Sequence, residues 1–392
     1  MTTLNDLKWY TTFFFLIGAI LSFADPITDG FTLAEFYKEN HLRWFMWGVI
    51  FMFIPCCSFV LVSSMTGSFE SVHSVKDGVL MVLHSFNPFS PAWASFKAFL
   101  LCLKNFKKLW RGEEVDCEDH EINDVNRLFG YVKLAPFTEV ITESIPQFII
   151  QLYAASVQEE AVKIIQIISL SVSCLSIVWA FTAADELCLH GVEIEVKIKY
   201  KILFFVTNLF LLTSRLLAIC YFIIVFQLWI AFVLLFHCLI VAVADSNFRC
   251  KVLNWRFVNI SLFFFPFHWI RDDLSAPLDE EGMRCRRRQL RKIQWLSHIM
   301  FVTENFAMIL LFFYLGKHSD AGFAFPATVY VCTASILGSS MRLVHFRFLL
   351  RGRVAPEANV TNEELEAIGL TIQQALMNAF AVAQEWQLAH EG

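Results

Sequence analysis

The sequence predicts an all-α polytopic membrane protein with eight transmembrane helices in two pseudo-symmetric four-span halves. Three observations predict this class. The 392 residues are 57% hydrophobic and only 17% charged, with a mean hydropathy of +0.55, a composition that suits lipid as the solvent. Apolar runs of membrane-spanning length recur along the chain. A short polar pattern also occurs twice, in similar surroundings.

A helix that crosses a bilayer needs about 20 mostly apolar residues, and eight segments meet this requirement. They lie near 13–36, 44–66, 130–154, 162–184, 202–221, 223–244, 295–315 and 325–350. The first run has a weak basic region before it and acidic residues where a signal peptide would be cut, so we interpret it as a membrane helix. The fifth and sixth spans form one run, which we expect to turn near 221–224.

Two further apolar stretches, 79–102 and 257–270, are each broken by proline among aromatic residues. Proline removes a backbone donor and bends a helix. Two interpretations stay open for these broken helices. They are re-entrant, with protein or water satisfying the freed backbone groups, or they lie flat at the membrane interface.

The loop charges predict the orientation. With a cytoplasmic N-terminus, most basic residues fall in cytoplasmic loops, including the six of the run 284–292. The opposite side keeps only Lys38, Arg43, Lys163 and Lys317. This asymmetry follows the positive-inside rule, so both termini are expected to be cytoplasmic.

The repeated pattern is a Thr-Glu pair with a tyrosine ten residues after the glutamate. It occurs as Thr142-Glu143 with Tyr153 and as Thr303-Glu304 with Tyr314. A charged loop and a proline-broken segment precede each copy, and one more span follows it. We therefore predict a first four-span repeat at 1–201, a second at 202–355 and a cytoplasmic tail helix at 356–392. Transporters built from such repeats place their functional path at the repeat interface.

Ionisable residues inside the predicted spans are the candidate functional residues, because a charge at the helix centre costs about 2.5–3.5 kcal/mol on insertion scales. The first span has Asp25 and Asp29 one turn apart, and the third has a polar stripe at every fourth position. The stripe consists of Glu139, Glu143, Gln147 and Gln151. Arg215, Glu304, Arg342 and His345 complete the set.

These residues also have structural interpretations. Asp29, Arg342 and His345 could sit at the headgroup level, with their polar ends in the interface. Arg215 could be the structural partner of one carboxylate. The stripe must face protein or water, and the acids outnumber Arg215. A polar path between helices is therefore the predicted consequence.

Other classes of function find no support. A net charge of −5 without a basic excess argues against nucleic-acid binding. The 11 cysteines lie mostly in apolar runs and lack the spacing of a disulfide framework or a zinc site. No phosphate-binding loop, metalloprotease helix or nucleophile elbow occurs. We predict no enzyme activity, no cofactor and no metal.

Three stretches together resemble the XK-related family: Asp25-Pro-Ile-Thr-Asp29-Gly, Phe53-Ile-Pro55, and the run from Glu143-Ser-Ile-Pro-Gln147 to Gln151-Leu-Tyr153. The resemblance implies eight spans in two halves, a broken helix in each half and a cytoplasmic C-terminal helix. We expect the protein in the plasma membrane, and its short outer loops suit internal membranes equally. Several relatives are phospholipid scramblases that expose phosphatidylserine in apoptosis after caspase cleavage, whereas the founding member acts largely as a partner of other membrane proteins.

The tail helix has an apolar face that is expected either to lie on the membrane or, as the resemblance implies, to dock into a cytoplasmic cavity. That docking face is Leu365, Ile368, Ile372, Leu376 and Phe380. No aspartate follows Asp320, so a caspase cannot release this tail. The sequence ending at Asp119 matches a caspase site formally.

Two hypotheses for function follow. In the first, the chain is a phospholipid scramblase whose headgroup path is lined or braced by Asp25, Asp29, Glu139, Glu143, Gln147, Gln151, Arg215 and Glu304. In the second, it is a non-transporting membrane partner protein with a purely structural polar network. Membrane phospholipids and a membrane or cytoplasmic protein are the expected partners. A chemosensory-type receptor or solute carrier is a third class; the half-repeat and the short outer loops count against a receptor.

Overall fold

The computed structural model describes residues 9–65, 89–111, 113, 128, 132, 136, 139–158, 161–191, 198–237, 280–315 and 324–351, and every regular element in these ranges is helical. The chain divides into two compact units. The described residues up to Phe205 belong to the first unit and those from Val206 to the second. The broken segment at 257–270 and the tail at 356–392 lie outside the described residues. The three-part division at 201 and 355 therefore stays a prediction.

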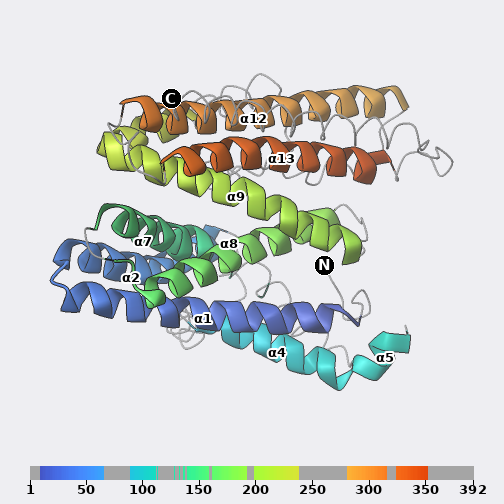
Figure 1. Ribbon diagram of the computed structural model, residues 1–392. Helices are drawn as coiled ribbons and strands as arrows, with labels where there is room; N and C mark the ends of the chain where they lie inside the picture. The colour runs from blue at the N-terminus through green and yellow to red at the C-terminus, as the bar shows by residue number, and fades with distance from the viewer. Residues whose placement is uncertain are drawn as a thin grey trace. The chain divides into compact units, whose positions relative to one another are not determined.

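The first unit is a bundle around α1 (Figure 1). Its helices are α1 (Thr11–Lys38), α2 (Leu42–Met65), α4 (Ser90–Lys104), α5 (Phe106–Arg111), the π-helix η3 (Val140–Ser144), α7 (Ile145–Val157) and α8 (Ile164–Gly191). Helix α1 packs against α2, α4 and α8, and α7 packs against α2 and α8. Three predicted spans, at 13–36, 44–66 and 162–184, thus correspond to single long helices.

Helix α4 shows what the proline-broken segment at 79–102 forms in its described part. Pro91 lies in the first turn of α4, directly after the first residue Ser90, where a proline has no intrahelical bond to lose. The small side chains of Ala94, Ala98 and Cys102 then face Phe15 of α1 in one buried cluster. Small residues allow such close packing of helices.

The second unit contains α9 (Ile198–Phe226, from Val206 onward), the 3₁₀ turn η4 (Gln227–Trp229), α12 (Glu280–Leu315) and α13 (Ala324–Arg351). Helix α9 runs unbroken through 221–224, so the turn predicted there is wrong. The helix ends instead at η4, where Gln227 has a φ of 46°. Nothing in the apolar run up to Phe226 interrupts the backbone, whereas the positive φ at Gln227 does.

Helix α12 is 36 residues long, which corresponds to about 54 Å and exceeds the roughly 30 Å thickness of a hydrocarbon layer. The basic run at 284–292, predicted as a loop, forms the N-terminal part of this helix. The span predicted at 295–315 is its C-terminal part. Helical propensity of arginine and glutamine explains the continuation beyond the apolar stretch.

Five helices in the described part of the chain are long and apolar enough to cross a membrane: Thr11–Lys38, Ile164–Ala184, Ile198–His237, His298–Leu315 and Ala324–His345. A shorter apolar helix occupies Leu42–Ile54. The prediction of an all-helical membrane protein is thus confirmed at this level. The count of eight spans and the pairing of two halves stay predictions.

Helix α1 shows the arrangement that suits a lipid solvent. Its buried face carries Ser22, Asp25 and Asp29, whereas large apolar side chains such as Phe23 and Phe31 are more than half exposed. A soluble protein of this size would bury those phenylalanines and expose the acids. The polar groups of α1 therefore bond within the protein, and its aromatic groups face outward.

Helices α9 and α13 approach closely at Gly338. A Cβ atom on this residue would lie 2.8 Å from Leu211 Cγ and 3.1 Å from the Leu211 backbone nitrogen. We expect Gly338→Ala to lower the free energy of unfolding by about 1–3 kcal/mol, because the helix backbone must move. Gly30→Ala on α1 is the matched control, since nothing lies within 4 Å of its added Cβ. Equal thermal unfolding midpoints for the two variants would contradict this packing.

Candidate functional site

The polar stripe predicted on the third span is buried inside the first unit. Glu139 precedes η3, Glu143 lies on it, and Gln147 and Gln151 lie on α7; their exposed fractions are 8%, 3%, 0% and 1%. The π-helix adds a residue to the turn that carries Glu143, so the spacing departs from the strict α-helical register expected from the sequence. Such π-bulges occur frequently at functional sites.

The two aspartates of α1 face this stripe. Ser144 Oγ donates to Asp25 Oδ2 at 2.7 Å, and Ser173 Oγ of α8 donates to Asp25 Oδ1 at 2.5 Å. Gln151 Nε2 and Ser169 Oγ both donate to Asp29 Oδ1 at 2.8 Å. Helices α1, α7 and α8 therefore meet at their polar faces.

We call these residues the first-unit cluster: Asp25, Asp29, Glu139, Glu143, Ser144, Gln147, Gln151, Ser169 and Ser173. Helix α2 adds a backbone carbonyl, since Gln147 Nε2 donates to Gly48 O at 2.5 Å. Glu139 and Glu143 lie close enough to Asp25 for negative charges on them to repel one another. The cluster thus gathers four carboxyl groups in a small buried volume.

The cluster is short of hydrogen-bond donors. Asp29 Oδ2, Glu143 Oε1, Gln147 Oε1 and Gln151 Oε1 are buried and have no donor within the described part of the chain. The two amide oxygens are acceptors, and a carboxyl oxygen is one when it carries no proton. In addition, none of the four carboxyl groups forms an ion pair with a described lysine, arginine or histidine. The first-unit cluster therefore has buried oxygens that a further hydrogen-bond donor could satisfy.

Asp29, Arg342 and His345 are buried within their units. Each exposes only 1% of its surface, and Arg342 Nη1 donates to Asn208 Oδ1 of α9 at 3.2 Å. Their placement at the headgroup level stays a prediction.

The second unit holds its own polar cluster around Arg215. Arg215 Nη2 lies 2.8 Å from Glu304 Oε2, and Arg215 Nη1 donates to Asn305 Oδ1 at 2.9 Å. His237 Nδ1 lies 2.8 Å from Glu304 Oε1, and Asn305 Nδ2 donates to Ser335 Oγ at 3.0 Å. The predicted partnership of Arg215 with one carboxylate is confirmed. We call Arg215, His237, Glu304, Asn305 and Ser335 the second-unit cluster.

The contacts of the two clusters follow one scheme. The repeated glutamates, Glu143 and Glu304, are each followed by a residue that bonds the buried ionisable group of the unit's first helix. Ser144 bonds to Asp25 on α1, and Asn305 bonds to Arg215 on α9. The last helix of each unit contributes serines four residues apart, Ser169 and Ser173 on α8 and Ser335 and Ser339 on α13. The ionisable group on the first helix differs between the units, because it is the carboxyl group of Asp25 in the first and the guanidinium group of Arg215 in the second.

The eight residues predicted to line or brace the headgroup path fall into two groups. The first unit brings together Asp25, Asp29, Glu139, Glu143, Gln147 and Gln151. The second unit brings together Arg215 and Glu304. Sequence reasoning missed the serines, His237 and Asn305. A serine pair four residues apart in each fourth span was the available signal. His237 had no signal of its own, since one histidine in an apolar helix is common.

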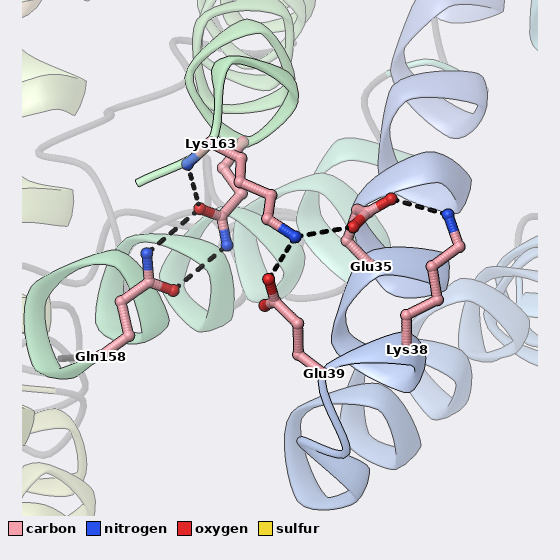
Figure 2. A network of polar contacts seen from close by, with 6 residues as sticks. Glu35, Lys38, Glu39, Gln158 and Lys163 are labelled. Atoms are coloured by element: carbon pink, nitrogen blue, oxygen red, sulfur yellow. Dashed lines mark hydrogen bonds and ion pairs between the residues drawn. The ribbon is translucent and has the colours of Figure 1, made fainter. Parts of the chain in front are cut away.

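A third set of polar contacts lies where α1 ends and α8 begins (Figure 2). Lys163 Nζ, just before α8, contacts Glu35 Oε2 at 2.9 Å and also Glu39 Oε1. Lys38 contacts the other oxygen of Glu35 at 2.8 Å. The carboxylates of Glu39 and Glu35 raise the pKa of the Lys163 ammonium above its ordinary value. We call Glu35, Lys38, Glu39 and Lys163 the end network; its charges, unlike those of the first-unit cluster, are paired.

A cavity of about 60 Å³ lies between α1, α4 and α8. Phe15, Trp179 and Gly18 form part of its wall, with hydroxyl groups from Ser22 and Ser95. Ser22 lies one turn before Asp25 on α1, so the cavity adjoins the first-unit cluster. It has room for a few water molecules and not for a lipid headgroup.

The described helices bury carboxyl, amide and guanidinium groups and expose large apolar side chains. This combination defines the class of polytopic α-helical membrane proteins with polar clusters inside the helix bundle. The family model of XK-related proteins matches residues 13–351, and the chain belongs to the XK-related family. No match is found among the curated proteins.

The remaining predicted residues lie outside the described part of the chain. They are the tail docking face, Leu365, Ile368, Ile372, Leu376 and Phe380, and the formal caspase site at Asp119. Their roles stay predictions.

Proposed function

We propose that this chain is a phospholipid scramblase and that the first-unit cluster contacts lipid headgroups as they cross the bilayer. The observation that carries the proposal is a set of four buried oxygens without a hydrogen-bond partner in the described residues, two from carboxyl groups and two from amides, in a cluster whose four carboxyl groups form no ion pair there. A structural network of this size would normally satisfy its buried groups. Unsatisfied groups inside a membrane bundle support a role in binding polar groups that pass.

A row of polar groups along the path lowers the energetic cost of moving a headgroup through hydrocarbon. A headgroup cannot enter hydrocarbon without losing its hydrogen bonds, and each lost bond costs several kcal/mol in an apolar medium, on the order of 4–6. Hydroxyl, amide and carboxylate groups along α1, α7 and α8 replace water at those positions. Movement along them follows the lipid gradient, so the proposal assigns no enzymatic reaction, cofactor or metal to the chain.

In this proposal the second-unit cluster is a brace. Arg215, Glu304, His237 and Asn305 bond to one another, which fixes α9 against α12. Since a buried pair holds helices in register, this cluster maintains the fold while the first unit contacts lipid.

The cellular setting follows from membership in the XK-related family. We propose a plasma-membrane protein with both termini in the cytoplasm that contributes to phosphatidylserine exposure in apoptosis. The tail helix would then control access from the cytoplasmic side, and a protein partner or a cut elsewhere would release it.

A second candidate function is a non-transporting partner of other membrane proteins. The Arg215–Glu304 pair and the Asn305–Ser335 hydrogen bond favour it, because these contacts form within the protein and need no ligand. It leaves the donor-poor first-unit cluster unexplained.

Reconstitution of the full chain into liposomes separates the two candidates. Vesicles carry an acyl-labelled fluorescent phospholipid, and membrane-impermeant dithionite removes the outer-leaflet signal. We expect the loss of fluorescence to continue well beyond about half. A loss that stops at about half in vesicles with confirmed insertion, as in protein-free vesicles, would favour the partner protein.

A further inference from the structure

We propose that the elbow where α4 passes into α5 is a binding site for anionic phospholipid headgroups at the membrane surface. The elbow comprises residues 104–111, which include four basic residues and no acidic one. It belongs to the first unit and shares no residue with the first-unit cluster. The proposal concerns lipid that stays in its leaflet, so it goes beyond the proposed function and does not depend on it.

The elbow lies level with the start of the first candidate membrane span, which begins at Thr11. The ring of Trp9, just before that span, lies 4.7 Å from the ring of Trp110 between centroids. One turn further along α1, the ring of Phe13 lies 6.2 Å from that of Phe106. Helix α5 therefore lies at the N-terminal end of α1, at the edge of the apolar layer (Figure 1).

Helix α4 reaches this edge from inside the layer. Its 15 residues extend over about 22 Å, less than the roughly 30 Å of hydrocarbon. It begins beside the middle of α1, because the ring of Phe89 lies 5.2 Å from that of Phe23. Its outer side is apolar, with Trp93, Leu100 and Leu103 about half exposed. This outer side is thus suited to contact acyl chains up to the elbow.

The inner side of the elbow is anchored in the protein. Asn105 Nδ2 donates to Leu101 O at 3.1 Å where α4 ends. Leu109 of α5 is buried in the same cluster that joins α4 to α1. These contacts turn the remaining side chains of the elbow outward, and the exposed ones are Lys104, Lys107, Trp110 and Arg111.

The exposed basic groups of the elbow are available to a ligand. Lys104 and Lys107 form no ion pair with a residue in the described part of the chain. Arg111 Nη1 lies 3.5 Å from Glu113 Oε1, and both side chains of this pair are more than half exposed. Exposed pairs of this kind contribute little, so the elbow presents a positive surface.

The surroundings favour a phospholipid over a dissolved anion. Tryptophan and basic residues together are typical of the membrane–water interface, and the apolar side of α4 lies next to them. The loop charges predict that this side of the protein is cytoplasmic, where the leaflet carries anionic lipids. Lysine acts as a point charge without the planar fork of arginine. Binding should therefore depend on the charge of the headgroup more than on its shape.

Binding is tested on the purified full chain in detergent. Anionic phosphatidylglycerol is titrated into the micelles, with zwitterionic phosphatidylcholine as the control lipid, and the thermal unfolding midpoint is measured. A ligand that binds only the folded state raises the midpoint. We expect phosphatidylglycerol to raise it more than phosphatidylcholine does. Sodium chloride should reduce the difference, because it screens exposed charges.

Lys104→Gln/Lys107→Gln removes the two unpaired charges of the elbow. Each basic residue near an anionic surface contributes a factor of about five to affinity, so this variant should need on the order of 25-fold more phosphatidylglycerol for the same rise. Lys104→Arg/Lys107→Arg keeps the charge and should respond like the wild type. Lys38→Gln/Lys199→Gln is the matched control, since it removes two exposed lysines elsewhere in the first unit and should keep the response.

Three results would overturn the proposal. An equal rise with phosphatidylcholine would mean that lipid of any charge stabilises the protein. An equal loss of response in Lys38→Gln/Lys199→Gln would mean that overall charge, and not the elbow, attracts the lipid. The same rise with inorganic phosphate in place of lipid would indicate a site for dissolved anions. None of these measurements involves lipid crossing, so they test the elbow separately from the scramblase.

Discussion

Replacing Arg215 by leucine is expected to lower the free energy of unfolding by about 3–5 kcal/mol. Arg215 is fully buried, and its loss would leave the Glu304 carboxylate without its guanidinium partner and Asn305 Oδ1 without its donor. A leucine fills much of the volume but supplies no donor. The measurement is the thermal unfolding midpoint in detergent, together with the yield of monodisperse protein.

Arg215→Lys is the matched control for this variant. It keeps the positive charge near Glu304 but cannot reach both partners with a planar fork, so an intermediate loss of stability is expected. A wild-type midpoint for Arg215→Leu would show that the pair is not a brace. It would also place Arg215 in contact with water, contrary to its burial in the second unit.

Replacing both Asp25 and Asp29 by asparagine is expected to have the opposite effect on stability and a large effect on transport. Asparagine keeps one oxygen acceptor at each position, its amide nitrogen can donate to a neighbouring serine hydroxyl, and it removes two buried carboxyl groups that no described cation pairs. The unfolding midpoint should therefore stay the same or rise. Lipid crossing should fall by more than about tenfold, since the proposed path loses two of its four carboxyl groups.

The control for the double variant is Glu35→Gln. It removes a carboxylate at the end of the same helix, within the paired end network, and should leave the crossing rate unchanged. A double variant that is destabilised and transports lipid normally would mean that the aspartates serve the fold alone.

Much of the fold could be predicted because burial in lipid requires long apolar runs, and these mark helices such as α1, α8 and α13. The end of α9 and the full length of α12 could not be predicted from the sequence. Hydropathy does not detect the backbone conformation of Gln227, and it does not separate a basic helix from a basic loop.

The candidate site was only partly predictable for a related reason. Carboxylates stand out in an apolar run because they are costly there, so Asp25, Glu143 and Arg215 were evident. Serine is common in membrane helices, and only the four-residue spacing that both fourth spans share marks Ser173, which bonds to Asp25. The separation of the polar residues into one donor-poor and one paired cluster depends on which helices meet, and that is a property of the packing.

The measurement that tests the account most directly is the dithionite-accessible fluorescence of vesicles carrying wild-type protein or Asp25→Asn/Asp29→Asn at equal density. The account predicts that the wild type loses fluorescence well beyond about half, while the folded double variant stays close to the protein-free level over the same period. The same loss of fluorescence for both proteins would contradict it, because lipid would then cross without the aspartate carboxyl groups of the first-unit cluster.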